Sequence, residues 1–330
     1  NTSGGSGGNM FLSSDFHTAR FVGCTFEDGV SEGGWGGGAT CYGDSAFYFF
    51  NNCVFEDNTC LNSGAAVYAG FRAAVTIDSC IFDGNENFDG IGTVAGQNDS
   101  TFIQVFNSSF DFNVSDGSGG ALSGNITNSS ISFVVDNCTF TGNTVNDGIG
   151  GAIHLSELGD DDISTLTLSN STFIFNSSPE QGGAINLINA NADITNCVFA
   201  SNTANGAGIG GAISINASDS NKVNTVILNS TFYQNSGDLA GGIAHWTGDS
   251  DVSSTLTLQN NILQNLGINY ALEDGNPVAV SNGGNLDENE SATDVLDHPT
   301  DLFGMDAMLT DPFDADFNLL AGSPCIDAGV

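Results

Sequence analysis

The sequence predicts an all-β protein, a right-handed parallel β-helix of about nine coils. Two short phrases carry this prediction, Asn-x-x-Phe and Gly-Gly-Ala-Ile, which alternate along most of the 330 residues. The first phrase recurs nine times, with Leu for Phe in the last copy, and successive copies are 26 to 33 residues apart. Such a repeat is too short for a domain and too long for the left-handed hexapeptide form, which needs about 18 residues per turn.

Each repeat is expected to form about three short strands, because its apolar stretches alternate with polar residues and end at Gly, Asn or Asp. Stacked coils lie about 4.8 Å apart, so residues at equivalent repeat positions should form columns. In Ile153-His154-Leu155 the aliphatic residues share one side of the strand. The pattern therefore predicts that His154, Asn186, Ser214 and His245 form one outward-facing column.

Three residue types recur at fixed repeat positions and predict structural ladders. The repeated aromatic residues should stack inside the coils, and they are Phe26, Phe55, Phe82, Phe110, Phe140, Phe173, Phe199 and Phe232. Amides three residues later should bond from coil to coil, and they are Asn58, Asn85, Asn113, Asn143, Asn176, Asn202 and Asn235. A column of small thiols is expected two residues before the aromatic position, at Cys24, Cys53, Cys80, Cys138 and Cys197.

One elongated domain in three parts is expected. Residues 1–15 form an N-terminal lead segment, residues 16–270 form the β-helix, and residues 271–330 form an irregular closing segment of the same domain. The open ends of a solenoid expose unpaired strands and must be covered. The sequence shows no amphipathic capping helix at either end, which favours stacking of one molecule on the next.

The charge of the chain excludes several partners. It has 39 Asp and Glu against 3 Lys and Arg, which gives a formal net charge of -36. We expect no binding to nucleic acid or anionic membranes, because no basic patch can form to neutralise phosphates. No run of about 18 apolar residues occurs, so no direct membrane span is predicted. The few trypsin sites favour an extracellular or cell-surface location for a secreted, processed chain.

The alternation of Gly-Gly-Ala-Ile with Phe-x-x-Asn, over roughly residues 20–265, resembles the repeats of the chlamydial polymorphic outer-membrane proteins. It also resembles the wider right-handed β-helix repeat proteins of environmental bacteria. The stretches 281–286, 301–306 and 322–329 resemble the closing segment of the latter proteins. The resemblance implies a secreted surface protein with an adhesive or structural role, and it carries over no catalytic residues.

Several other residues are candidates for covalent or metal chemistry. Cys41 and Cys60 lie in neighbouring segments outside the thiol column and are the expected disulfide in an oxidising compartment. No cofactor is predicted, although calcium is the ion that an acidic loop would take, and the densest such loop holds Asp160, Asp161 and Asp162. Four Asn-x-Ser/Thr sites in the solenoid lie outside both ladders and are the glycosylation candidates, Asn98, Asn125, Asn128 and Asn216.

These observations favour a non-enzymatic extracellular structural or adhesive surface protein that associates end to end into a fibre. Its expected partners are other copies of the chain, or surface glycans and host or matrix components. A β-helix enzyme acting on carbohydrate, either a polysaccharide lyase or a glycoside hydrolase, is the first alternative. A lyase of the pectate type needs clustered cations, and Arg20, Arg72 and Lys222 are far apart in the sequence. A monomeric surface adhesin is the second alternative.

Overall fold

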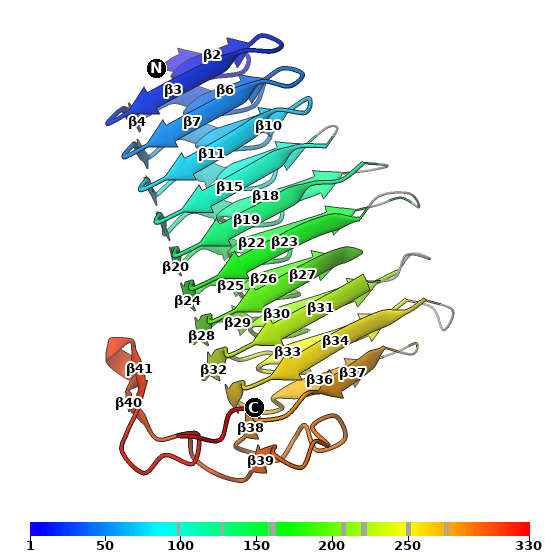
Figure 1. Ribbon diagram of the computed structural model, residues 1–330. Coiled ribbons are helices and arrows are strands. Elements are labelled where there is room, and N and C mark those ends of the chain that lie inside the picture. The colour runs from blue at the N-terminus through cyan, green and yellow to red at the C-terminus, as the bar shows by residue number, and fades with distance from the viewer. Residues whose placement is uncertain are drawn as a thin grey trace.

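The computed structural model describes residues 1–97, 100–126, 129–157, 159, 163–205, 209–218, 223–248, 252–273, 275 and 277–330. The predicted fold is confirmed. The chain forms a right-handed parallel β-solenoid of about nine turns, with its N-terminus at one end of the rod (Figure 1). A coil contributes strands to as many as four sheets, one more than the sequence predicts. The additional sheet, sheet A, consists of two-residue strands that follow the Asn ladder.

Sheets A and B each contain parallel strands from successive coils. Sheet A consists of β1 (Thr2–Ser3), β5 (Val30–Ser31), β9 (Thr59–Cys60), β13 (Glu86–Asn87), β17 (Val114–Ser115), β21 (Thr144–Val145), β25 (Ser177–Ser178) and β29 (Thr203–Ala204). Sheet B consists of β2 (Met10–Ser13), β6 (Ala39–Tyr42), β10 (Val67–Gly70), β14 (Val94–Gln97), β18 (Leu122–Ile126), β22 (Ile153–Glu157), β26 (Ile185–Ile188), β30 (Ile213–Ala217), β33 (Ile243–Thr247) and β36 (Tyr270–Glu273).

Sheets C and D complete the coil. Sheet C consists of β3 (Thr18–Val22), β7 (Phe47–Asn51), β11 (Ala74–Asp78), β15 (Phe102–Phe106), β19 (Ser132–Asp136), β23 (Ser164–Ser169), β27 (Ala190–Thr195), β31 (Val223–Leu228), β34 (Ser254–Gln259) and β37 (Val278–Ser281). Sheet D consists of β4 (Thr25–Glu27), β8 (Val54–Glu56), β12 (Ile81–Asp83), β16 (Ser109–Asp111), β20 (Thr139–Thr141), β24 (Thr172–Ile174), β28 (Val198–Ala200), β32 (Thr231–Tyr233), β35 (Ile262–Gln264), β38 (Leu286–Asp287) and β39 (Leu302–Phe303).

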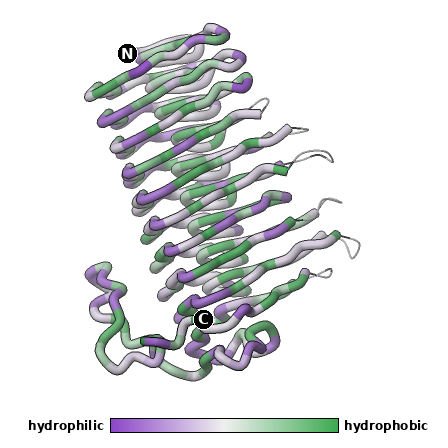
Figure 2. Tube along the Cα trace, viewed as in Figure 1, coloured by the Kyte–Doolittle hydropathy of each residue, from purple (hydrophilic) through white to green (hydrophobic). Residues whose placement is uncertain are grey.

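The repeated Phe residues of sheet D form a continuous aromatic stack in the core. Neighbouring rings from Phe26 to Phe232 are 4.5 to 5.0 Å apart between centroids, and their planes differ by no more than 15°. Leu263 continues the column in the next coil, opposite Phe232. Figure 2 shows hydrophobic residues recurring in every coil. This regular core fixes the register of the sheets, because a slip of one residue would turn the rings outward.

The Asn of the Asn-x-x-Phe phrase occupies the turn between sheets C and D. Every copy has a positive φ, from 49° to 62°, including Gly23 and Ser79 where the Asn is replaced. Left-handed backbone disfavours most side chains but is tolerated by Gly and by Asn. The turn therefore explains why the phrase begins with Asn or Gly, whereas the Phe that ends it is explained by the core.

The outward column predicted on sheet B is not exposed to solvent. His154, Asn186 and Ser214 do pair in register, but each is at most 2% exposed. The connections from sheet A to sheet B cover them, as Asn186 shows by donating to Gln181 Oε1 at 3.2 Å. His245 belongs to a different column, next to Ile215, and points into the solenoid. The prediction was therefore wrong because it did not anticipate a layer outside sheet B.

The solenoid extends further at both ends than the predicted boundaries. Within residues 1–15, β1 and β2 pair with β5 and β6 of the following coil. After residue 271, β37, β38 and β39 continue sheets C and D. The segment after Asp287 then covers the last coil, since Ala292, Val295 and Leu296 pack into the main core. The expectation of an uncovered end therefore does not hold at the C-terminal side.

Buried carboxylates fasten this cover. Asp287 Oδ2 accepts the backbone N–H of Ala292 at 2.7 Å. Asp301 accepts the hydroxyl of Ser281 at 2.6 Å and the backbone N–H of Asn285 at 3.0 Å. The chain then turns back along the rod as the two-stranded hairpin β40 (Leu309–Asp311) and β41 (Asp316–Leu319), with the 3-10 helix η1 (Pro312–Asp314) between them. The hairpin lies beside the flank of sheet D near β28 and β32 (Figure 1).

Candidate functional site

The Phe-x-x-Asn amides form a buried ladder with a structural role. From Asn58 to Asn235, each Nδ2 donates to Oδ1 of the Asn in the next coil at 2.7 to 2.9 Å. The backbone N–H of each ladder Asn donates to the same oxygen, as Asn113 does to Asn143 at 3.2 Å. Nδ2 also reaches a Phe carbonyl of the preceding coil, as in Asn143 to Phe110 at 2.9 Å. Each amide therefore satisfies polar groups that a buried turn would otherwise leave unpaired.

The thiol column has a related structural role. Where the next coil carries Ser, that hydroxyl accepts the backbone N–H of the Cys, as Ser108 does from Cys80 at 3.0 Å. The Sγ of Cys80 accepts from the backbone N–H of Cys53 at 3.4 Å. Burial raises the pKa of the Cys80 and Cys197 thiols to about 12. These groups stay protonated at neutral pH and are poor nucleophiles.

The disulfide predicted between Cys41 and Cys60 is absent, and both thiols are free. Cys41 lies on β6 in sheet B, whereas Cys60 lies on β9 in sheet A. The Cys60 thiol donates to the carbonyl of Gly34 at 3.1 Å instead. Sequence proximity misled the prediction because neighbouring segments of one coil belong to different sheets.

Two histidines are buried and neutral at pH 7, His154 beneath the connections that cover sheet B and His245 inside the solenoid. Burial lowers the pKa of His154 to about 4, and it lowers that of His245 to about 4 as well. His245 lies between the Ser254 hydroxyl, 2.6 Å from Nε2, and the Tyr270 hydroxyl, 3.2 Å from Nδ1. The Ser–His contact has the spacing of a nucleophile and its base. Because Ser254 is 0% exposed, a substrate could not reach it, and the cluster is structural.

The predicted modification and calcium sites have different outcomes. Asn98, Asn128 and the acidic residues Asp160, Asp161 and Asp162 lie outside the described residues. Asn125 is half-buried on β18. Asn216, on β30, is only 7% exposed, so the folded chain does not present it for glycosylation. Within the described part of the chain, no three His, Cys, Asp or Glu residues are grouped closely enough to hold a metal ion.

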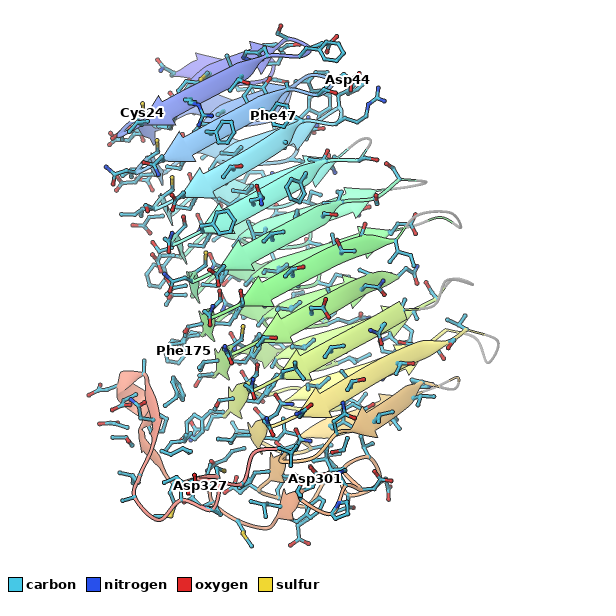
Figure 3. The ribbon with its side chains drawn as sticks, viewed as in Figure 1. Cys24, Asp44, Phe47, Phe175, Asp301 and Asp327 are labelled. Carbon is cyan, nitrogen blue, oxygen red and sulfur yellow. The ribbon has the colours of Figure 1, made fainter. Side chains whose placement is uncertain are left out.

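The outer face of sheet C is a flat, partly exposed surface. Phe47 and Phe102 lie in one column of this face, with Ala74 between them, and are 48% and 37% exposed. Figure 3 shows the Phe47 ring on this face. Toward the C-terminal half, Thr165, Thr167, Asn191, Asp193 and Asn224 line a shallow polar hollow of about 290 Å³. This face combines an aromatic surface with groups that can bind hydroxyls.

The outward column of sheet D changes character along the rod. Its residues, in coil order, are Glu27, Glu56, Asp83, Asp111, Thr141, Ile174, Ala200, Tyr233 and Gln264. The apolar half is where Leu309, Phe317 and Leu319 of the hairpin pack. The rings of Tyr233 and Phe317 are 6.2 Å apart, in an edge-to-face arrangement. The hairpin therefore covers the part of sheet D that would otherwise expose an apolar strip.

The hairpin does not fill the space beside this contact, and two adjoining hollows remain, which we call the C-terminal groove. One hollow, of about 410 Å³, is lined by Tyr233, Gln264, Asp306, Thr310 and Asp311, among others. The other, of about 250 Å³, is lined by Ile174, Phe175, Ala200, Ser201 and Pro312, among others. Tyr233 and Pro312 line both hollows. Figure 3 shows Phe175 at the edge of sheet D that faces the hairpin.

The groove is electronegative. Burial, and then the neighbouring carboxylate of Asp306, raise the pKa of Glu288 and that of the Tyr233 hydroxyl. Gln264 Nε2 donates to Asp306 Oδ1 at 3.4 Å, while Gln264 Oε1 is buried without a hydrogen-bond partner in the described structure. The two described arginines lie at the other end of the rod, where Arg72 pairs with Asp44 at 3.2 Å and Arg20 lies 4.0 Å from the Phe49 ring centre.

Sequence analysis missed this groove because it depends on a long-range contact. The available signal was the outward residue of sheet D, the one that follows each repeated Phe. This outward residue changes from acidic to apolar after Thr141. An apolar strip on a solvent-facing sheet indicates a surface that another segment or a partner covers. The residues that form the opposite wall, around Asp306 and Pro312, have no repeat position.

The chain matches no protein-family model, and no curated protein or solved structure is significantly similar to it. The resemblance to the polymorphic outer-membrane repeats therefore rests on the two repeat phrases. Among the described residues, no helix is long and apolar enough to cross a membrane.

Proposed function

We propose that the protein is a non-enzymatic, extracellular surface rod that adheres to glycans through its flank. The observation that carries this proposal is the outer face of sheet C, where exposed aromatic rings and a polar hollow lie on one flat surface. The aromatic stack and the amide ladder in the same coils favour a rigid platform, since each coil contacts the next through both. A platform of this kind loses little conformational freedom when it binds an extended polymer.

Assembly into an end-to-end fibre is the less favoured form of this function. Stacking of identical rods requires both ends to offer unpaired strands to each other. The C-terminal end is covered by the segment that contains Ala292, Val295 and Leu296. We therefore place the partner surface on the flank and not at the ends.

A glycoside hydrolase is the second candidate. Such enzymes pair one carboxyl group of raised pKa with a second, ionised carboxylate beside the sugar. Burial and then the carboxylate of Asp306, a residue that lines the C-terminal groove, raise the pKa of Glu288. This pair is the observation that favours the alternative, and Glu288 would be the general acid.

Retention on insoluble polysaccharides tests both candidates. The full chain is mixed with cellulose, chitin, xylan and pectin, and the bound fraction and the released reducing ends are measured. Retention on at least one polymer without new reducing ends is the expected result, and Phe47→Ala with Phe102→Ala should reduce it. Absence of retention on every polymer contradicts the adhesive function. Release of reducing ends that Glu288→Gln abolishes would establish the hydrolase instead.

A further inference from the structure

The C-terminal groove is a concave surface separate from the face of sheet C. It exists because the hairpin is held at one line of contact, where Leu309 and Phe317 pack on Tyr233 and Ala200. On either side of that line the hairpin segment and sheet D do not touch, and the hollows of about 410 and 250 Å³ lie between them. Concave sites with an apolar floor and a few polar groups are the usual form of a ligand site.

The two hollows differ in chemistry. The smaller one is largely apolar, with Ile174, Ala200 and the 63% exposed ring of Phe175. The larger one carries the acidic and polar groups, Asp306, Asp311, Thr310 and Gln264, on a wall that Leu309, Pro312 and Leu320 also line. A ligand that fills both must therefore present an apolar face to the ring and hydrogen-bond donors to the acidic wall.

The negative charge of the groove favours a ligand of positive charge. Asp306 lies close enough to Glu288 to raise its pKa, and neither described arginine is near. An anionic ligand would add to this repulsion, whereas a cationic one would relieve it. A bare metal ion does not fit, because the described carboxylates of the groove are not grouped as metal ligands.

We propose that the C-terminal groove binds an amine-bearing oligosaccharide. This inference names a ligand class for the proposed adhesive function and rests on that function. The ammonium group contacts Asp306 and Asp311, the hydroxyls bond to Thr310 and Gln264, and the C–H face of a sugar ring covers Phe175. An ammonium–carboxylate hydrogen bond is charge-assisted and is stronger than a neutral one. Aromatic rings bind the apolar faces of such ligands while their edges remain in water.

Calorimetric titration of the full chain tests the proposal, with four probes of similar length. These are the β-1,4-linked glucosamine hexamer, its N-acetylated form, a galacturonate hexamer and hexalysine. The glucosamine hexamer should bind, and its affinity should fall as salt is raised. The neutral hexamer should bind at least about tenfold more weakly, as expected for the loss of one charge-assisted contact. The galacturonate hexamer should not bind.

Matched variants locate the binding. Asp306→Asn and Phe175→Ala should each lower the affinity for the glucosamine hexamer about tenfold. Two controls lie outside the groove. Phe112→Ala alters the position that corresponds to Phe175 two coils earlier, where the ring is also 63% exposed, and Asp111→Asn removes a carboxylate from the acidic half of sheet D. These controls should leave the affinity unchanged, and circular dichroism should show that all four variants are folded.

Other outcomes overturn the proposal in distinct ways. Hexalysine that binds as tightly as the glucosamine hexamer would show a site for basic peptides and not for sugar. Equal losses in the groove variants and their controls would show nonspecific attraction to an acidic rod, and no loss in any variant would place the site elsewhere. Absence of binding to the glucosamine hexamer, with retention on another polysaccharide, would refute the groove and leave the adhesive function standing.

Discussion

Asn113 and Asn143 show how one coil holds the next. Nδ2 of Asn113 donates to Oδ1 of Asn143 at 2.9 Å, and the backbone N–H of Asn113 donates to the same oxygen at 3.2 Å. Nδ2 of Asn113 also reaches the Phe82 carbonyl in the preceding coil at 3.0 Å. One buried amide therefore connects three coils. Its removal would leave the Phe82 carbonyl without this donor, and the backbone N–H and Nδ2 of Asn85 without their acceptor.

Asn143→Ala should lower the free energy of unfolding by about 2–4 kcal/mol, because each unpaired buried polar group costs about 1–3 kcal/mol. Urea unfolding followed by circular dichroism measures the change. The control is Asn146→Ala in the same coil, where an exposed amide bonds to Asp116 at 2.7 Å, and it should cost less than about 0.5 kcal/mol. Equal effects of the two substitutions would contradict the structural role of the ladder.

Phe140→Ala should remove two stacked contacts, with Phe110 at 5.0 Å and Phe173 at 4.5 Å between ring centroids. A cavity in a packed core of this kind costs about 3–5 kcal/mol. Phe102→Ala, on the exposed face of sheet C, is the comparison and should cost far less. Similar midpoints in urea for the two variants would show that the internal stack does not determine stability.

The stability of the rod should fall as the pH falls through the range set by its histidines. His154 has a pKa of about 4 in the folded chain, against an ordinary value of 6.5. Between these values the unfolded chain binds a proton that the folded chain does not, so acid favours unfolding. From pH 7 to pH 4.5 this group alone should contribute a loss of about 2–3 kcal/mol.

The variant His154→Asn isolates this contribution, because Asn occupies the same column at position 186. Its free energy of unfolding should depend less steeply on pH between 7 and 4.5 than that of the natural chain. The carboxyl groups titrate equally in both proteins and cancel in the difference. Parallel pH curves would show that the pKa of His154 is the same in the folded and the unfolded chain.

Thiol labelling tests the cysteine arrangement. All eight cysteines are free, and only Cys24 and Cys325 are partly exposed. Under native conditions an aromatic disulfide reagent should therefore react rapidly with these two alone, and after unfolding it should react with all eight. If the unfolded, unreduced chain reacts with only six equivalents of the reagent, two cysteines form a disulfide. The predicted pair Cys41 and Cys60 would then have to be reconsidered.

The docking of the hairpin can be tested by Phe317→Asp, which places a charge against Tyr233. Hydrogen exchange should accelerate in residues 309–319, while the amides of sheets B and C keep their protection. Met305→Asp, at a 44% exposed position, is the control and should leave exchange in the hairpin unchanged. Loss of protection throughout the rod would mean that the hairpin is part of the cooperative core.

The repeat made the solenoid predictable because each coil must meet its neighbours with the same residues. The Phe stack, the Asn ladder and the left-handed turn at Asn52 all follow from one repeated phrase. Sheet A was missed because a strand of two residues, such as β9 (Thr59–Cys60), has no measurable alternation. His154 was misplaced because alternation shows which side of a strand is apolar, but it does not show whether a connection covers the other side.

The C-terminal groove was beyond sequence reasoning for another reason. Phe317 is more than 80 residues from Tyr233 in the chain, and no periodicity relates the two. Only the change from Asp111 to Ile174 in the outward column of sheet D indicated that something covers that surface. The identity of the cover, and the hollows beside it, depend on how the chain turns after the buried carboxylate of Asp301.

Sedimentation velocity tests most directly whether the flank of a single rod carries adhesion. The full chain is sedimented over a range of concentrations, alone and with a soluble form of the polysaccharide that retains it. A rod that binds through its flank should sediment alone as one species with the mass of a single chain, and it should move with the faster polymer boundary when the polysaccharide is added. Growth of the chain into a concentration-dependent series of larger species, with no transfer to the polymer boundary, would contradict adhesion through the flank.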